Sequence, residues 1–429
     1  DAATAATLDD GAEIDNTAVV AGLEITADDG TGISGSSFTS ELGPLISITA
    51  ATGNIAGTLA NAKAGAVTIT AAEGELDAVD VTALLDITAT AGDAIFASSF
   101  VSEEGNLIIT SGGDIVGSDF YAKLGTATFN DGTVTGQLDG NVVETFGAIS
   151  VDATWINGST FVSEDGSIDI AATAGDIVAG SATSKTSSVT ATAFGNIDGL
   201  VVDAATDATL AATDAASSII GVTVDAGGEL LATAGYDIAG GTFWADNGAT
   251  LRAGQDITGS AVDAANAGLT AGNDISGTTV DAATGSVGLT AGGDITGGSA
   301  SSDFQSVTAT AVGSIDGLTV DAAVNAVLTA SGLTSSITGV TVDGGSVELD
   351  AGYDIVGGSI WSDTGATLTA GRDITGTVVD AAAAVLTAGF GITGAIVDAS
   401  TGTIEVTATA GEIDGSEFSA CQGISALAG

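Results

Sequence analysis

Nearly identical fifteen-residue segments occur twice in this chain, as LTAGNDISGTTVDAA at residues 269–283 and LTAGRDITGTVVDAA at residues 368–382. The underlying pattern, L-x-A-G-x-D-I-x-G-x-x-V-D-A, recurs between and around them, with intervals of 18 to 20 residues between adjacent clear copies. Its first aspartate lies at Asp237, Asp256, Asp274, Asp294, Asp354 and Asp373. A repeat this short predicts a structure that grows by stacking one small unit on the next.

A longer period is superimposed on the short one. SVTATAFGNIDGL at residues 188–200 is matched by SVTATAVGSIDGL at residues 306–318, an offset of 118 residues. We therefore divide the chain into diverged coils over residues 1–187, a first long copy over residues 188–305, and a second copy over residues 306–429 that ends in a partial coil. We expect these three parts to form one continuous solenoid.

The residues of the repeat favour strands over helices. Gly, Thr, Val and Asp are weak helix formers, and strings such as VTVD, LTAG and VTATA alternate apolar with small polar residues. About nineteen residues are too few for a propeller blade or a βαβ unit. The sequence therefore predicts an all-β fold, a parallel β-helix (β-solenoid) with coils of about 18–22 residues. In it, the Ile of DI and the Val of VD form inward ladders.

The composition limits the partners and the chemistry. The chain has 55 Asp and Glu against 5 Lys and Arg, a formal net charge of −50, yet 45% of its residues are hydrophobic. Such a chain is too apolar for a disordered acidic protein and too acidic to bind nucleic acid or insert into an anionic membrane. It has no His, so an imidazole base, a catalytic triad and a histidine-based zinc site are excluded.

We therefore expect no enzyme and assign no catalytic residue. Lyases built on β-helices need a basic residue beside clustered aspartates, and the cations here lie scattered through different coils. They are Lys63, Lys123, Lys185, Arg252 and Arg372. A glycosidase that uses two carboxylates remains compatible with the residue types, although a repeated surface rarely contains one unique cleft.

A second column of aspartates is the candidate metal site. The Asp of V-D-A recurs at Asp225, Asp263, Asp281, Asp321, Asp343, Asp380 and Asp398. If the Val points inward, the Asp points outward, and carboxylates stacked on successive coils repel by roughly 0.8 kcal/mol per pair even in bulk water. Two interpretations remain open: the aspartates cap turns and keep the protein soluble, or Ca²⁺ bridges successive coils. We expect no other cofactor.

Three aromatic residues and the single cysteine are the remaining candidates. Tyr121, Trp244 and Trp361 take the place of the outward Asp on particular coils, where they would stack on glycans, make lateral contacts between solenoids, or lie flat against neighbouring side chains. Cys421 is expected on a turn, where it would either crosslink two chains or remain an unpaired side chain with no role.

The units LTAGNDISGTTVDAA and LTAGGDITGG resemble the roughly nineteen-residue repeats of filamentous-haemagglutinin-type bacterial adhesins and related large surface proteins. The resemblance covers most of residues 188–415. It implies a right-handed parallel β-helix that extends from the cell surface and mediates adhesion.

These observations predict a structural subunit or segment of an extracellular or cell-surface fibre. Residues 427–429 stop part-way through the repeat and residues 1–2 continue it, so we expect head-to-tail self-association with copies of the same chain. The alternative is an adhesin stalk or glycan-binding module that contacts glycans or other surface polymers. An ice-binding face would need a flat, regular Thr array, and the T-x-T strings, such as Thr190/Thr192, look scattered in the sequence.

Overall fold

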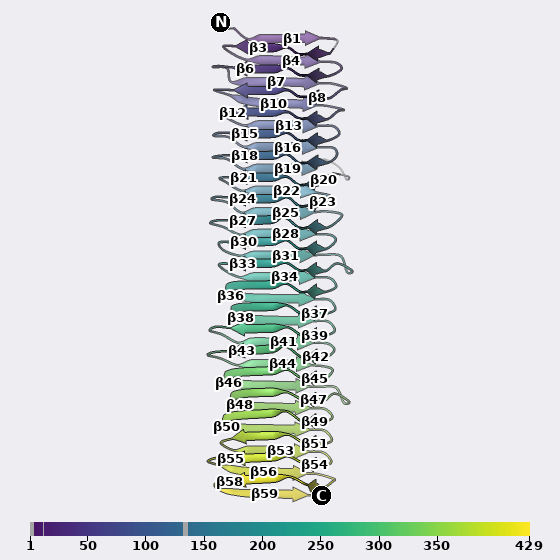
Figure 1. Cartoon of the computed structure of the whole chain (residues 1–429), viewed down its shortest axis with the longest axis vertical. Helices are drawn as coiled ribbons and strands as arrows, with labels where there is room; N and C mark the ends of the chain where they lie inside the picture. The colour runs from purple at the N-terminus through teal and green to yellow at the C-terminus, as the bar shows by residue number, and fades with distance from the viewer. Residues whose placement is uncertain (1–3, 12, 132–135) are drawn as a thin grey trace. The chain divides into compact units, whose positions relative to one another are not determined.

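A computed structural model describes residues 4–11, 13–131 and 136–429 of the chain. Residues 1–2, which the expected head-to-tail contact involves, lie outside the described residues. Every described element is a β-strand, from β1 (Ala6–Asp10) to β59 (Gly423–Ala428) (Figure 1). The predicted all-β class is therefore confirmed.

The chain divides into two compact units, each of which is a parallel β-solenoid. Unit 1 comprises Asp1–Thr213 with Val222–Gly227, and unit 2 comprises Asp214–Gly221 with Gly228–Gly429. Together their described residues make about 21 turns.

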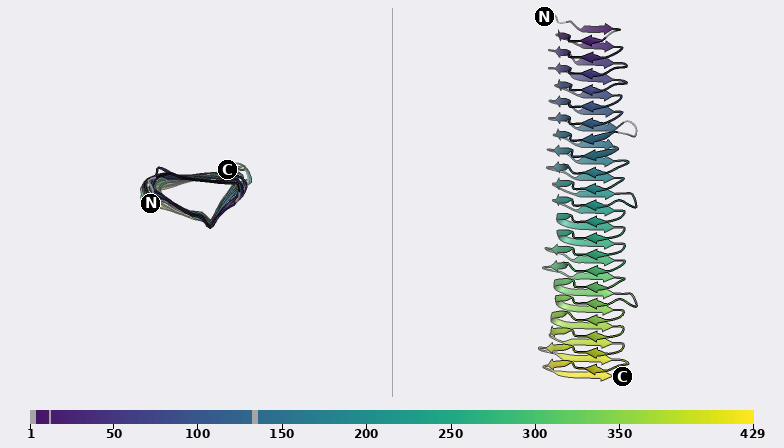
Figure 2. Two further views of the ribbon diagram at one scale, coloured as in Figure 1. Left: turned by 90° about the horizontal axis from the view of Figure 1, so that it is seen from above. Right: turned by 45° about the vertical axis from the view of Figure 1, so that its right-hand side comes forward.

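Most coils contain three strands, illustrated in unit 2 by β39 (Ile275–Ser276), β40 (Thr279–Ala282) and β41 (Val287–Ala291). Each strand pairs in parallel with its counterpart on the next coil, so β39 pairs with β42 (Ile295–Thr296) and β41 with β44 (Val307–Ala311). Seen end-on, the coils enclose a three-sided space with one long side (Figure 2).

In several coils of unit 2, the second and third strands merge into one longer strand. These are β36 (Thr242–Ala253), β38 (Ala261–Ala271), β46 (Thr319–Ala330), β48 (Thr341–Ala351) and β50 (Ser359–Ala370). The register between merged strands shifts at the bend, for example between Ala245 and Gly248. Such a shift is a β-bulge, which lets a strand turn a corner without losing its partner.

The isoleucines of the repeat stack in register, as predicted. In unit 2, the stacked and buried members are Ile219, Ile238, Ile257, Ile275, Ile295, Ile315, Ile337, Ile355, Ile374 and Ile392. Fully burying an Ile side chain contributes about 1.5–3 kcal/mol. Because every coil repeats this contribution, the core is a column of equivalent contacts between neighbouring coils.

Unit 1 follows the same plan with larger residues in the core. Phe100 on β15 (Ser99–Ser102) stacks on Phe120 of β18 (Asp119–Ala122), with ring centroids 5.2 Å apart. Phe120 also meets Phe129 of β19 (Ala127–Asp131) edge to face at 4.8 Å. These rings occupy the positions that Val and Leu occupy in unit 2, so aromatic packing replaces aliphatic ladders there.

Two glycines of the repeat have different structural roles. Gly277, two residues after the ladder Ile275, has φ of +57°, a left-handed conformation that suits the sharp turn before β40. Gly272, which ends the LTAG string, lies close above the preceding coil: a Cβ there would be 2.1 Å from the carbonyl oxygen of Gly254. Glycine suits position 277 because of its backbone conformation. It suits position 272 because a Cβ there would collide with the preceding coil.

Candidate functional site

The predicted aspartates and tryptophans of unit 2 fall into one column of side chains on the surface, which we call the outward column. Parallel pairing in register places in this column Trp244, Asp263, Asp281, Ser301, Asp321, Asp343, Trp361, Asp380, Asp398 and Ser419. Six of the seven predicted aspartates and both predicted tryptophans therefore share this column. Two of these aspartates are Asp380 on β52 (Val378–Ala381) and Asp398 on β55 (Ile396–Ala399).

Unit 1 has an equivalent column that contains two further predicted residues, Tyr121 and Asp225. Its members in register include Tyr121, Glu144, Val162, Thr183, Asp203 and Asp225. Asp225 lies on β33 (Thr223–Ala226) and is four coils from Glu144. Within unit 1, Tyr121 and Asp225 thus share a column but are not neighbours.

Strand alternation orients this column as the sequence predicted. Val262 and Val280 are buried, whereas the adjacent Asp263 and Asp281 are exposed. Trp244 and Trp361 are each 43% exposed. The aromatic rings therefore replace outward aspartates, and both tryptophans have surface available for a ligand.

Each tryptophan lines a shallow pocket together with aspartates of neighbouring coils. The pocket at Trp361 has a volume of about 250 Å³ and is also lined by Asp343, Asp363 and Asp380. The pocket at Trp244 has a volume of about 200 Å³ and includes Asp263 and Asp281 in its lining. Both sites thus combine one aromatic ring with carboxylates from more than one coil.

The structure does not place three metal ligands together. Among residues 4–11, 13–131 and 136–429, no group of three or more His, Cys, Asp or Glu side chains is arranged to hold a metal ion. The outward column does put carboxylates on directly successive coils, as at Asp321 and Asp343 or at Asp380 and Asp398. Ca²⁺ bridging between such pairs stays a prediction.

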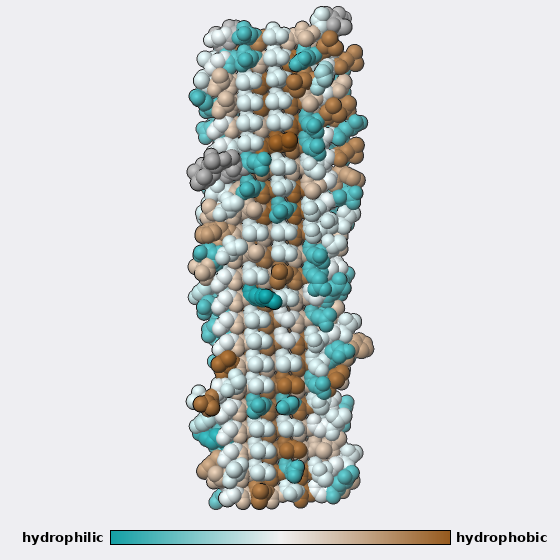
Figure 3. Space-filling model, turned by 180° about the vertical axis from the view of Figure 1, so that it is seen from behind, coloured by the Kyte–Doolittle hydropathy of each residue, from teal (hydrophilic) through white to brown (hydrophobic). Residues whose placement is uncertain are grey.

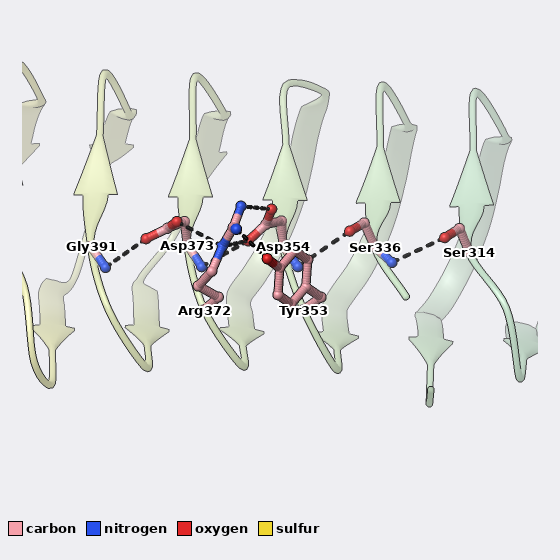
Figure 4. Close-up of polar contacts among 7 residues, drawn as sticks. All are labelled: Ser314, Ser336, Tyr353, Asp354, Arg372, Asp373 and Gly391. Carbon is pink, nitrogen blue, oxygen red and sulfur yellow. Dashed lines mark hydrogen bonds and ion pairs between the residues drawn. The ribbon is translucent and has the colours of Figure 1, made fainter. Parts of the chain in front are cut away.

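The other aspartate column, that of the D-I string, has a structural role. In unit 2, the Oδ1 atom of Asp256 accepts a hydrogen bond of 2.9 Å from the backbone N–H of Asp274, and Asp274 accepts one of 2.7 Å from Asp294. The series continues with Ser314 and Ser336 in place of aspartate (Figure 4). Each of these side chains therefore caps a backbone donor of the next coil.

One exposed arginine lies within this capping column. The Arg372 Nε atom donates to Asp354 Oδ1 at 2.9 Å and lies 2.9 Å from Asp373 Oδ2 (Figure 4). Its guanidinium carbon is 4.0 Å from the centre of the Tyr353 ring, and its terminal nitrogens contact the Tyr353 hydroxyl and Asp354. The hydrogen bond to Asp354 is the main cause that raises the pKa of Arg372 above its ordinary value. We call this group the Arg372 clamp.

The sequence analysis treated Arg372 as one of several scattered cations and missed the clamp. The available signal was positional: Tyr353 in AGYDI and Arg372 in AGRDI occupy the same place in adjacent repeats. Stacking like positions puts the cation directly beside the ring and between two successive aspartates of the capping column.

A regular threonine column was also missed. In unit 1, Thr49, Thr70, Thr90 and Thr110 are in register on four successive coils. In unit 2, the same is true of Thr270, Thr290, Thr310 and Thr329. Figure 3 views the side on which these strands lie, where pale side chains of intermediate hydropathy form regular columns. Single threonines are therefore aligned on these coils. The T-x-T pair does not recur on each of them, because Gly268, Gly288 and Val327 stand two residues before Thr270, Thr290 and Thr329.

Tyr121 lies in a pocket of about 250 Å³ in unit 1, which is also lined by Lys123, Glu144 and Phe146. Partial burial raises the pKa of Tyr121, and the negative charges of Asp119 and Glu144 raise it further. The phenol is therefore held in its neutral form, and it presents a ring beside charged groups.

Cys421 is exposed and forms no disulfide within the chain. Crosslinking between two chains through its thiol stays a prediction. Within the described ranges there is also no helix of the length and apolarity needed to cross a membrane.

Comparison with known proteins identifies no match: no family model, no curated protein and no solved structure is similar to this chain.

Proposed function

We propose that this protein is a structural segment of an extracellular or cell-surface fibre, in which the solenoid provides length and stiffness. The observation that supports this most directly is the in-register stacking of the buried ladder through each unit, which is isoleucine except for Leu76 and Leu138 in unit 1. Such a core repeats one contact on every coil, so extra coils add length and stability together. We propose no catalytic role.

The surface chemistry agrees with an external location. The chain carries a net charge of −50 and presents carboxylates in successive coils of the outward column. Mutual repulsion between them decreases as salt or divalent cations increase. In this proposal, Ca²⁺ is the ion that bridges them, and the resemblance to haemagglutinin-type adhesins provides the precedent for a surface fibre.

Location on the cell surface is the part of the proposal to test first. Antibodies raised against the purified chain would be applied to intact and to permeabilised cells of the source organism, followed by gold labelling and electron microscopy. We expect label on intact cells, along material that projects from the surface. Label confined to permeabilised cells would refute the external location.

Growth by association between copies of the chain is tested separately. Sedimentation velocity of the purified chain over a range of concentrations should show species that lengthen as concentration increases. A single sedimenting species at every concentration would refute self-association, but it would not refute the proposal that the chain is a segment of a fibre.

The second candidate function is a glycan-binding stalk, and the exposed tryptophans of the outward column favour it. An exposed indole is a common platform for the apolar face of a sugar ring. Neutral oligosaccharides should then change the tryptophan fluorescence, and the change should be lost when Trp244→Ala and Trp361→Ala are combined. Trp155 on β23 (Trp155–Asn157), which is 42% exposed and lies outside the outward column, provides the control variant Trp155→Ala.

A further inference from the structure

The Arg372 clamp shows how this solenoid binds a cation. One guanidinium lies beside the Tyr353 ring and contacts Asp354 and Asp373, which belong to successive coils (Figure 4). The aromatic face attracts the cation, while the two carboxylates neutralise it. The components of this arrangement are one ring and acidic side chains of successive coils.

The pocket at Trp361 has the same components without the cation. Trp361 pairs in register with Asp343 on the preceding coil and with Asp380 on the following coil, and both aspartates line the pocket. In the described part of the chain, neither carboxylate has an ion pair. The ring is 43% exposed, and Trp is the aromatic side chain that attracts cations most strongly.

The pocket at Trp244 in the same unit has the same components in another order, with both aspartates on the coils that follow the ring. Trp244 pairs in register with Asp263, which pairs with Asp281, and both aspartates line the pocket. The two tryptophans are separated by six coil steps in the outward column, which corresponds to roughly 29 Å at the usual strand spacing. One extended partner of about nine or more residues could therefore occupy both pockets and gain affinity from the second contact, whereas a shorter peptide occupies one pocket at a time.

The chain itself offers few cations for these pockets. Unit 2 contains only two basic residues, Arg252 and Arg372, and Arg372 is already held in the clamp. The three lysines of unit 1 form ion pairs with glutamates of their preceding coils, namely Lys63 with Glu41, Lys123 with Glu103 and Lys185 with Glu164. A second copy of this chain is thus a poor source of cations for these pockets.

We propose that the Trp361 and Trp244 pockets bind arginine or lysine side chains of a basic partner polypeptide. A cation over the ring relieves the repulsion between the flanking carboxylates, whereas a neutral sugar leaves that repulsion in place. The net charge of −50 attracts such a partner from a distance. The two tryptophans then fix where its cations bind. This proposal does not depend on the location of the protein or on fibre growth.

The test titrates the full chain with a hexa-arginine peptide and records tryptophan fluorescence and, independently, calorimetric affinity. The decisive variant combines Trp244→Ala with Trp361→Ala, which changes no charge, so bulk attraction is the same in variant and parent. We expect the double variant to bind about three- to tenfold more weakly, since a cation–π contact contributes on that scale. Trp155→Ala should bind as the parent does.

The contribution of the rings should persist in moderate salt, where attraction between separated charges is screened. A second variant, Trp244→Phe with Trp361→Phe, keeps an aromatic ring at each site and should retain part of the affinity. Circular dichroism of each variant shows that the solenoid is folded.

Two results would overturn the proposal. The first is equal affinity of hexa-arginine for the parent and both double variants, which would mean that only bulk charge attracts the peptide. The second is binding of a neutral cello-oligosaccharide, but not of hexa-arginine, at the tryptophans, which would favour the glycan-binding function.

Discussion

The two glycines of the repeat allow a prediction that separates steric from conformational requirements. In Gly272→Ala, the new Cβ would lie 2.1 Å from the carbonyl oxygen of Gly254, whereas ordinary contact begins at 3.4 Å. One coil must therefore move by about 1.3 Å relative to its neighbour, the difference between those two distances. Overpacking of this kind costs typically about 1–3 kcal/mol and sometimes more.

The displacement in Gly272→Ala also strains a hydrogen bond between coils. The backbone N–H of Gly272 donates to the carbonyl of Ala253 at 3.0 Å, and such a bond contributes about 0.5–1.5 kcal/mol net. We therefore expect a total destabilisation of about 3 kcal/mol for this substitution.

Gly277→Ala should be much milder, although Gly277 is the residue with positive φ. Nothing lies within 4 Å of the point that a Cβ would occupy there, and Ala97 and Ala179 adopt φ of 45° and 54° at the equivalent turn of other coils. A left-handed conformation costs about 1–2 kcal/mol for an L-residue, and the lower entropy of the unfolded Ala chain offsets about 0.4–1 kcal/mol of that. The expected net cost is about 1 kcal/mol.

Urea unfolding of the full chain, followed by far-ultraviolet circular dichroism, compares the two variants through their transition midpoints. Because repeat proteins can unfold in segments, hydrogen exchange of peptides from residues 254–292 provides a local measure of coil opening. Gly272→Ala should lower the midpoint and the local protection more than Gly277→Ala does. Equal effects, or the reverse order, would refute the close approach of successive coils at Gly272.

Three further predictions concern the aromatic core and the charged surface. Phe120→Ala should destabilise unit 1 by about 3–5 kcal/mol, measured by urea unfolding. Because the rings stack, a double-mutant cycle with Phe100→Ala should show a coupling free energy of about 0.5–1.5 kcal/mol. Since the folded state raises the pKa of Tyr121, the stability that this residue contributes is present below pH of about 10, the unfolded value, and is lost as pH rises through the higher folded pKa. Tyr121→Phe should remove this alkaline loss in denaturation experiments, and one of the three tyrosinate signals should disappear from an ultraviolet absorbance titration. Ca²⁺ should raise the Tm and EDTA should reverse the rise, and both effects should be smaller when Asp263→Asn and Asp281→Asn are combined. An unchanged Tm would refute Ca²⁺ binding by the outward column.

The parts of the structure that repeat on every coil were predictable from the sequence. The spacing of DI fixed the ladder that contains Ile275 and Ile295, and strand alternation then placed Val280 inside and Asp281 outside. The same count placed Trp361 in the outward column. These predictions needed only the assumption that equivalent positions stack.

The features that depend on two particular coils were harder to predict. The Arg372 clamp needs Tyr353 and Arg372 on adjacent coils, which follows from the register between them and not from either residue type. The threonine column was hidden because coil length varies: Thr270 and Thr290 are 20 residues apart, whereas Thr310 and Thr329 are 19 apart. A fixed period applied to the sequence therefore loses the alignment that the hydrogen-bonded register restores.

Stacking like residues stabilises an apolar core but concentrates like charges on the surface, and the two aspartate columns meet this problem differently. Asp256 and its equivalents each accept a backbone N–H from the next coil, so the peptide dipole compensates part of the charge. The outward column turns its carboxylates to solvent, and Asp343 and Asp380 flank an indole with no cation between them. The first column uses its charge to hold successive coils together. The second leaves its charge available for a cation from outside, so a basic partner gains free energy there by relieving the repulsion between carboxylates.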